Sequence, residues 1–268
     1  MGTDDPDGFS ADGEGPIRTV ELKSFWIDPL AVSNRRFATF VDTTGHVTDA
    51  ERYGWSFVFG GLLPDEFPDT RGIVGAPWWR QVYGADWRRP EGPRSSIDDR
   101  LDHPVVHISW RDARAFCAWA GLRLPTEAEW EFGARGGLVQ KRFPWGDELE
   151  PSQRHRMNVW QGTFPSHNTL ADGYLGTCPV NEFEPNGYGL CNTSGNVWEW
   201  CDDMFDPALE GGGAQVSPAT VGGEAKVIRG GSYLCHVSYC NRYRVAARSS
   251  NTIASSTGNM GFRCARDA

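Results

Sequence analysis

The chain has 268 residues, and its formal net charge is −9 because 35 acidic residues outnumber 26 basic ones. This acidic excess argues against a general nucleic-acid binder and against a binder of anionic membranes. Since the sequence contains no run of about 18 apolar residues, we expect no membrane span. The abundance of tryptophan (12), glycine (32) and proline (17) indicates loops packed by large flat side chains rather than long regular helices.

The first part of the chain predicts short elements separated by long loops. Residues 1–16 are acidic and glycine-rich and lack the basic start and apolar core of a secretory signal, so we expect a cytoplasmic protein. Residues 18–22 predict a strand, and Ser33 predicts the start of a helix with one apolar face. Residues 52–102 show no clear period, and we expect them to form a long, packed excursion that supplies functional surface.

Two further helices are predicted near the middle of the chain. The first covers residues 110–120, where apolar side chains recur at helical spacing. The second covers residues 127–133, and Thr126 and Glu129 have the spacing of a capping box at its start.

The last part of the chain is dominated by turn-forming residues. Residues 135–200 are dense in asparagine, glycine and proline, and residues 203–226 predict a surface loop. Residues 226–229 predict a strand. Because no stretch has the composition of an interdomain linker and no internal repeat occurs, we expect a single domain over residues 1–268.

The chain carries seven cysteines: Cys117, Cys178, Cys191, Cys201, Cys235, Cys240 and Cys264. The odd number leaves at least one thiol unpaired. A chain of this length with so few cysteines is not a disulfide-dense secreted scaffold. We therefore expect a reducing compartment, with one structural bridge at most.

Cys235 and Cys240 lie close together in a polar segment, ahead of a run containing Arg242, Arg244 and Arg248. The pair is compatible with a redox disulfide, a soft-metal site or two core cysteines. The spacing differs from that of zinc ribbons, and two thiolates alone suit Cu(I) better than Zn²⁺. The arginines could bind an anion or lower the pKa of a thiol, although such residues more often pair with carboxylates.

Two stretches are rich in oxygen ligands. One contains Asn158, Val159, Asp172 and Tyr174, and the other contains Asn192, Gly195, Val197 and Glu199. Amides, carboxylates and turn carbonyls together form Ca²⁺ sites. The same residue types also form ordinary turns, and from the residues alone the turn interpretation is preferred.

Several longer motifs together indicate a family. They are Gly121-Leu-Arg-Leu-Pro-Thr-Glu-Ala-Glu-Trp-Glu131, Phe143-Pro-Trp-Gly146, Asn158-Val-Trp-Gln-Gly162, Pro185-Asn-Gly-Tyr-Gly189, Gly195-Asn-Val-Trp-Glu-Trp200, Arg229-Gly-Gly-Ser-Tyr-Leu-Cys-His-Val-Ser-Tyr-Cys240 and Gly261-Phe-Arg-Cys264. On these motifs the chain resembles the formylglycine-generating enzymes, also called sulfatase-modifying factors, over essentially its whole length. The segment with both cysteines is the part specific to the oxidising members.

The resemblance implies an α+β, loop-rich fold related to C-type lectins. It also implies an oxidoreductase that uses O₂ to convert the cysteine of a Cys-x-Pro-x-Arg motif, in an unfolded sulfatase, to Cα-formylglycine. The implied catalytic residues are Cys235, Cys240 and Ser232, and the two cysteines would hold Cu(I). Both oxygen-rich stretches become Ca²⁺ sites under this resemblance, which reverses the preference for turns. We expect a monomer without a nucleic-acid or membrane partner.

The resemblance also implies differences from the family. Relatives carry a strand before the residue that matches Met1, and we expect that strand to be missing here. Cys117 and Cys264 match one cysteine pair of the family, so a bridge between them is possible.

Two alternatives remain on the sequence alone. A catalytically silent binding module would share the fold, but Cys235 and Cys240 argue against it. A nonheme-iron sulfoxide synthase would need a His-x3-His-x-Glu motif, and His103 and His107 supply only its first spacing.

Overall fold

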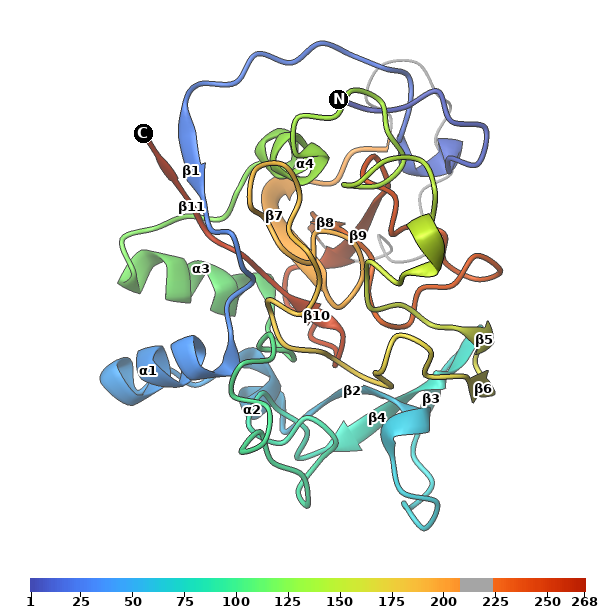
Figure 1. Ribbon diagram of the computed structural model, residues 1–268. Helices are drawn as coiled ribbons and strands as arrows, with labels where there is room; N and C mark the ends of the chain where they lie inside the picture. Colours follow the sequence, from blue (N-terminus) through green and yellow to red (C-terminus); the bar gives the residue numbers. More distant parts are fainter. Residues whose placement is uncertain (208–223) are drawn as a thin grey trace.

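Short helices and strands are joined by long loops in the computed structural model, which describes residues 1–207 and 224–268 (Figure 1). The α-helices in these residues are α1 (Asn34–Thr44), α2 (Asp49–Tyr53), α3 (Trp110–Trp119) and α4 (Glu127–Arg135), and the 3-10 turns are η1 (Ser10–Asp12), η2 (Gly60–Leu62) and η3 (Pro151–Gln153). The strands are β1 (Phe25–Ile27), β2 (Trp55–Phe59), β3 (Gly72–Ile73), β4 (Ala76–Tyr83), β5 (Gly162–Thr163), β6 (His167–Asn168), β7 (Trp198–Met204), β8 (Ala225–Arg229), β9 (Arg248–Thr252), β10 (Met260–Gly261) and β11 (Ala265–Asp267). This mixture confirms the expected α+β, loop-rich class.

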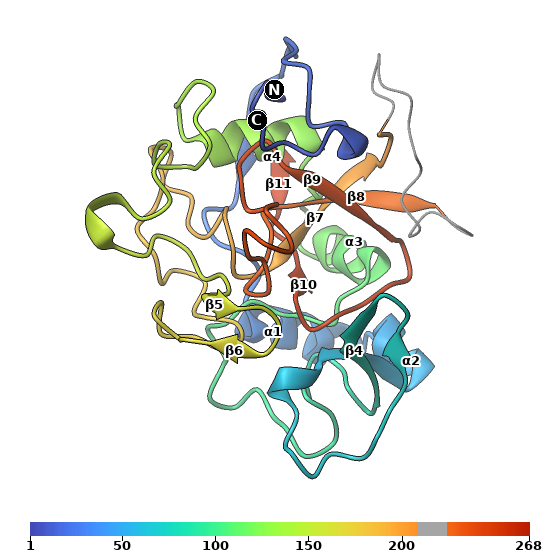
Figure 2. The ribbon, with the colours of Figure 1, turned by 90° about the vertical axis from the view of Figure 1, so that its right-hand side faces the viewer.

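A four-stranded sheet with the order β10-β7-β8-β9 lies at the centre (Figure 2). β10 runs parallel to β7, and the other neighbours are antiparallel. A second sheet has the order β2-β4-β3, and two-stranded ribbons form from β1 with β11 and from β5 with β6. The central sheet matters for function because β8 leads directly into the segment that contains Cys235 and Cys240.

The predicted helix starts are confirmed by their caps. The Ser33 side chain accepts a hydrogen bond from the Arg36 amide, and Thr126 and Glu129 form the expected capping box of α4. A second capping box, from Ser109, begins α3. Such caps satisfy amide groups that the first turn of a helix leaves without partners.

One prediction on the first part of the chain is wrong. Residues 18–22 form no strand; β1 begins at Phe25 instead, because that segment pairs with β11 near the end of the chain. The excursion predicted at residues 52–102 contains paired strands, since β2 and β4 pair in register from Trp55 opposite Tyr83 to Phe59 opposite Trp79. A pairing between distant segments leaves no periodic signal when both strand faces carry large side chains.

The predicted strand at residues 226–229 is confirmed as β8, whereas most of the predicted loop at 203–226 falls in residues 208–223, outside the described residues. The largest core cluster lies between α1, α3 and the central sheet, and Phe37, Phe116, Trp200 and Phe262 are fully buried in it. None of the helices in the described part of the chain is both long and apolar enough to cross a membrane.

Candidate functional site

The segment after β8 turns sharply and brings the two cysteines together. Gly231 has a φ of +72°, and a Cβ atom there would lie 3.0 Å from the Tyr243 Cα atom, so the turn requires glycine. The Cys235 amide donates to the Ser232 carbonyl, and the Cys240 amide donates to the His236 carbonyl. These turns place the Cys235 and Cys240 sulfur atoms 2.8 Å apart.

The two thiols differ in their acidity. Burial raises the pKa of Cys235, and the hydrogen bond to Cys240 raises it further. The same hydrogen bond lowers the pKa of Cys240; burial opposes this change and Arg242 reinforces it. Cys240 is therefore the more acidic thiol of the pair.

Both cysteines face one cavity of about 610 Å³. Ser232 also lines it, and its hydroxyl is held by hydrogen bonds from the Asn259 side chain at 2.9 Å and from the Leu234 amide. Other parts of the wall include the β3–β4 hairpin, β9 and Tyr239. The structure thus brings Cys235, Cys240 and Ser232 to one solvent-accessible site.

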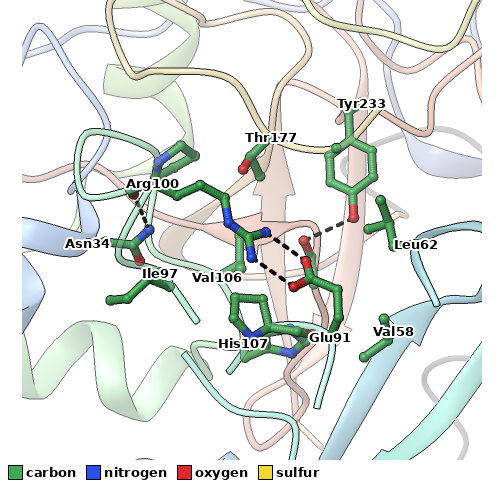
Figure 3. Close-up of a pocket in the computed structure, with 14 residues that line it drawn as sticks. Asn34, Val58, Leu62, Glu91, Ile97, Arg100, Val106, His107, Thr177 and Tyr233 are labelled. Atoms are coloured by element: carbon green, nitrogen blue, oxygen red, sulfur yellow. Dashed lines mark hydrogen bonds and ion pairs between the residues drawn. The ribbon is translucent and has the colours of Figure 1, made fainter. Parts of the chain in front are cut away.

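Figure 3 shows a smaller cavity, of about 170 Å³, beside the same segment. Tyr233 reaches this cavity and donates to the Gly258 carbonyl, while Arg100 forms a two-point ion pair with Glu91. These contacts anchor the start of the cysteine segment from the side that carries no thiol.

His107 also lines this smaller cavity, and it is fully buried. Its Nε2 donates to the Pro90 carbonyl, and its Nδ1 is hydrogen-bonded to the Ser56 hydroxyl. Burial lowers the pKa of His107 to about 4. Because both ring nitrogens have protein partners, His107 is a structural histidine and does not complete an iron motif with His103.

The first oxygen-rich stretch folds around Asp172. The Val159 and Tyr174 amides both donate to the Asp172 carboxylate, at 3.0 and 3.1 Å. Burial raises the pKa of Asp172. The Asn158 amide oxygen is buried without a hydrogen-bond partner, although the amide nitrogen donates to the Gly176 carbonyl at 2.8 Å. An oriented, unpartnered amide oxygen and a partly buried carboxylate in one folded stretch fit the oxygen ligands of Ca²⁺.

The second stretch shows the same feature at Asn192. Its amide oxygen is buried without a partner, while its amide nitrogen donates to the Pro179 carbonyl at 3.0 Å. Gly195 has a φ of +75°, and a Cβ atom there would lie 2.4 Å from the Asn158 carbonyl oxygen, so the two stretches touch. Val197 is buried and lies next to β7.

Both oxygens of the Glu199 carboxylate accept hydrogen bonds from other side chains. Its Oε2 accepts from Trp130 at 2.7 Å and from Arg263 at 2.6 Å, and its Oε1 accepts from Arg263 at 2.8 Å. Oε1 has a second lone pair, so the carboxylate could still serve a cation. Arg263 lies 64 residues from Glu199 along the chain, and its pairing with Glu199 was not predicted.

The arginines after the cysteine pair each bind a carboxylate. Arg242 pairs with Asp12, and Arg248 pairs with Glu127 of α4. Arg244 pairs with Glu14. Pairing with carboxylates, the more common role of such arginines, is thus confirmed, but the sequence did not identify the acidic partners.

The other cysteines lie away from the cavity. Cys117 and Cys264 are both unbonded, with sulfur atoms 3.7 Å apart. Cys178, Cys191 and Cys201 are buried, and burial raises the pKa of each.

The sequence and the fold were each compared with those of known proteins. Residues 1–268 match the family model described as "Sulfatase-modifying factor enzyme 1-like domain". The chain is 61% identical to the formylglycine-generating enzyme of Thermomonospora curvata, over 100% of this chain and 90% of that protein. It is 46% identical to the inactive C-alpha-formylglycine-generating enzyme 2 of Bos taurus, over 100% and 85%. The solved structure of PvdO from Pseudomonas aeruginosa has the same fold, with a TM-score of 0.65 at 24% identity over 100% of this chain and 90% of that chain.

Proposed function

Because the chain belongs to the sulfatase-modifying factor enzyme 1-like family, we propose that it is an oxidoreductase that converts a sulfatase cysteine to Cα-formylglycine. A relative named inactive shares 46% of the sequence, so overall likeness does not carry the activity. The observation that carries it is the pair Cys235 and Cys240, 2.8 Å apart and facing a cavity of about 610 Å³.

Copper(I) fits the donors at this cavity. Cys235 and Cys240 would hold it, since two close thiols form a soft donor pair and the described residues that line the cavity include no carboxylate or imidazole. When bound, Cu(I) supplies a centre that takes a further thiol and reacts with O₂. The protein supplies the two sulfur ligands Cys235 and Cys240 and the anchored hydroxyl of Ser232.

Calcium fits the two oxygen-rich stretches. Asn158, Val159, Asp172 and Tyr174 would hold one ion, and Asn192, Gly195, Val197 and Glu199 would hold the other. The support is the pair of buried, unpartnered amide oxygens on Asn158 and Asn192. These ions would stiffen loops that pack beside the cysteine segment, because the Gly195 amide donates to the Gly230 carbonyl at 2.8 Å.

The cavity fits an extended polypeptide that carries a Cys-x-Pro-x-Arg motif. Its walls include the partly exposed Ile73 and Tyr239, which suit apolar contacts along a chain that has not folded. The cysteine loses its sulfur as sulfide and gains the aldehyde oxygen, which releases two electrons. Since O₂ accepts four electrons on its way to water, an added thiol must supply the other two.

An aminooxy probe tests the proposal, because it labels the aldehyde product and not the substrate thiol. A Cys-x-Pro-x-Arg peptide is incubated with the protein, Cu(I), O₂ and a thiol reductant. The unaltered protein and Cys201→Ala, which changes a buried cysteine outside the cavity, should yield labelled peptide. An unlabelled peptide in both reactions favours the silent binding module instead.

A further inference from the structure

The N-terminal turn around η1 packs against the segment that follows the cysteine pair (Figure 2). Arg248 at the start of β9 donates to the Asp12 carbonyl at 3.1 Å, and Arg244 forms a two-point, fully buried ion pair with Glu14. A Cβ atom on Gly13 would lie 2.7 Å from the Pro207 carbonyl oxygen. The turn is therefore fixed closely in place by residues far along the chain.

Arg242 is the arginine of this run that reaches the cysteine cavity. It lines the cavity together with Cys235 and Cys240. Its Nε donates to the Asp12 carboxylate at 2.6 Å, and its guanidinium carbon lies 3.9 Å from the centre of the Phe9 ring. An ion pair and a cation–π contact thus hold one guanidinium group from two sides.

The positive charge of Arg242 would balance the net negative charge of the site if Cys235 and Cys240 bind a monovalent cation as thiolates. Two thiolates with one Cu(I) carry a net charge of −1, and Cys235 and Cys240 are both buried. A buried charge is costly unless a counter-charge lies close by and is held in place. Arg242 is the cation that lines the cavity.

We propose that Asp12 and Phe9 are positioning residues of the thiol site, which hold Arg242 beside Cys240 and so set the affinity of the cysteine pair for Cu(I). This inference rests on the proposed copper-binding role of Cys235 and Cys240. It adds the N-terminal turn, more than 200 residues away along the chain, to that site.

Titration of the full chain with Cu(I) against a chromogenic Cu(I) chelator, under exclusion of oxygen, tests the inference without any turnover. Asp12→Ala should weaken Cu(I) binding by about tenfold or more, because loss of a residue that orients a metal site commonly costs 10–100-fold in affinity. Asp12→Asn keeps a hydrogen-bond acceptor for Arg242 and should restore most of the affinity. Phe9→Leu should cause a smaller loss in the same direction.

Asp5→Ala is the matched control, because Asp5 lies in the same N-terminal segment and pairs at 2.7 Å with Arg142, which does not line the cysteine cavity. Its Cu(I) affinity should equal that of the unaltered protein. The double variant Asp12→Ala/Arg242→Gln should bind Cu(I) no more weakly than Arg242→Gln alone, since Asp12 acts through Arg242. Thermal unfolding of each metal-free variant separates a loss of affinity from a loss of fold.

Two results would overturn the inference while the proposed function survives. One is an unchanged Cu(I) affinity in folded Asp12→Ala, and the other is an equal loss in Asp12→Ala and Asp5→Ala. If the unaltered protein itself fails to compete for Cu(I), the copper-binding role fails first, and the positioning role fails with it.

Discussion

At the scale of single residues, the local surroundings set the acidity of two groups. These are the Cys235 and Cys240 thiols and the imidazole ring of His107. The Cys235 and Cys240 thiols differ in pKa because burial and their mutual hydrogen bond raise the pKa of Cys235, whereas the same hydrogen bond and Arg242 lower that of Cys240. His107 is the opposite case, since burial lowers its pKa to about 4 although the hydrogen bond to the Pro90 carbonyl acts to raise it. The two thiols face the larger cavity, whereas both ring nitrogens of His107 have hydrogen-bond partners in the protein.

Replacing either cysteine of the pair by serine should abolish copper-dependent turnover. Hydroxyl oxygen is a hard, weakly acidic donor and binds Cu(I) poorly, so neither single variant keeps the soft donor pair. Initial rates of aldehyde formation in Cys235→Ser, Cys240→Ser and the control Cys201→Ala provide the measurement. Retained turnover in either serine variant would remove the pair from the proposed mechanism.

The buried His107 should make folding stability depend on pH. Its pKa is about 4 in the folded protein and near 6.5 when exposed, so the unfolded chain binds the proton more readily between these values. Burial of the neutral His107 therefore makes the free energy of unfolding depend on pH. Its contribution is fully present above about pH 6.5, and about 3 kcal/mol of it is lost as the pH falls toward 4. Urea unfolding at several pH values should show this loss.

The variant His107→Asn isolates that contribution from the other groups that titrate. Asparagine tolerates the φ of +59° at this position and carries no charge at any pH. The unaltered protein should therefore lose more stability than His107→Asn between pH 7 and pH 4. Parallel pH dependences of the two proteins would show that His107 is not responsible.

At the scale of elements, ion pairs between side chains join α4 to the central sheet in addition to apolar contacts. Glu127, in its first turn, accepts from Arg229 of β8 at 3.1 Å and from Arg248 of β9 at 2.6 and 2.7 Å. All three side chains are buried. The network fixes the end of β8, from which the cysteine segment departs.

Glu127→Gln should destabilise the protein by about 3–5 kcal/mol, because it leaves the buried Arg248 guanidinium without its carboxylate, while Arg229 keeps Glu131 at 2.6 Å. The exposed pair of Arg114 and Asp202 provides the control, and Asp202→Asn should cost less than about 1 kcal/mol. Urea unfolding at pH 7 measures both changes. Equal effects of the two substitutions would contradict the structural role of the network.

At the scale of the whole molecule, contacts between distant segments decide what the sequence could predict. Helix starts were predictable because Ser33, Thr126 and Glu129 act within one turn of their own helix. Cys235 and Cys240 were predictable as a pair because a short loop joins them. The partners of the site were not, since Asp12 meets Arg242 and Arg263 meets Glu199 only through the fold. The first strand was predicted at residues 18–22 rather than at β1 for the same reason, because its position depends on pairing with β11.

Calcium should stabilise the whole molecule if the two oxygen-rich stretches bind it. At a Ca²⁺ concentration of about one hundred times Kd, binding to one site adds about 2.7 kcal/mol, and Tm rises accordingly. Asn158→Ala and Asn192→Ala should each reduce this rise, whereas the exposed Asn181→Ala should not. A Tm that does not respond to Ca²⁺ in the unaltered protein would rule out both sites.

The central claim is that the cavity at Cys235 and Cys240 converts a substrate cysteine to an aldehyde, and the mass of the substrate tests it most directly. A peptide with a Cys-x-Pro-x-Arg motif is incubated with the protein, Cu(I), O₂ and a thiol reductant, and its mass is recorded beside that of a peptide with alanine in place of the cysteine. Conversion of the thiol to the aldehyde predicts a loss of about 18 Da from the cysteine peptide alone, and only when Cu(I) is present. An unchanged mass of the cysteine peptide with the copper-loaded protein would contradict the account.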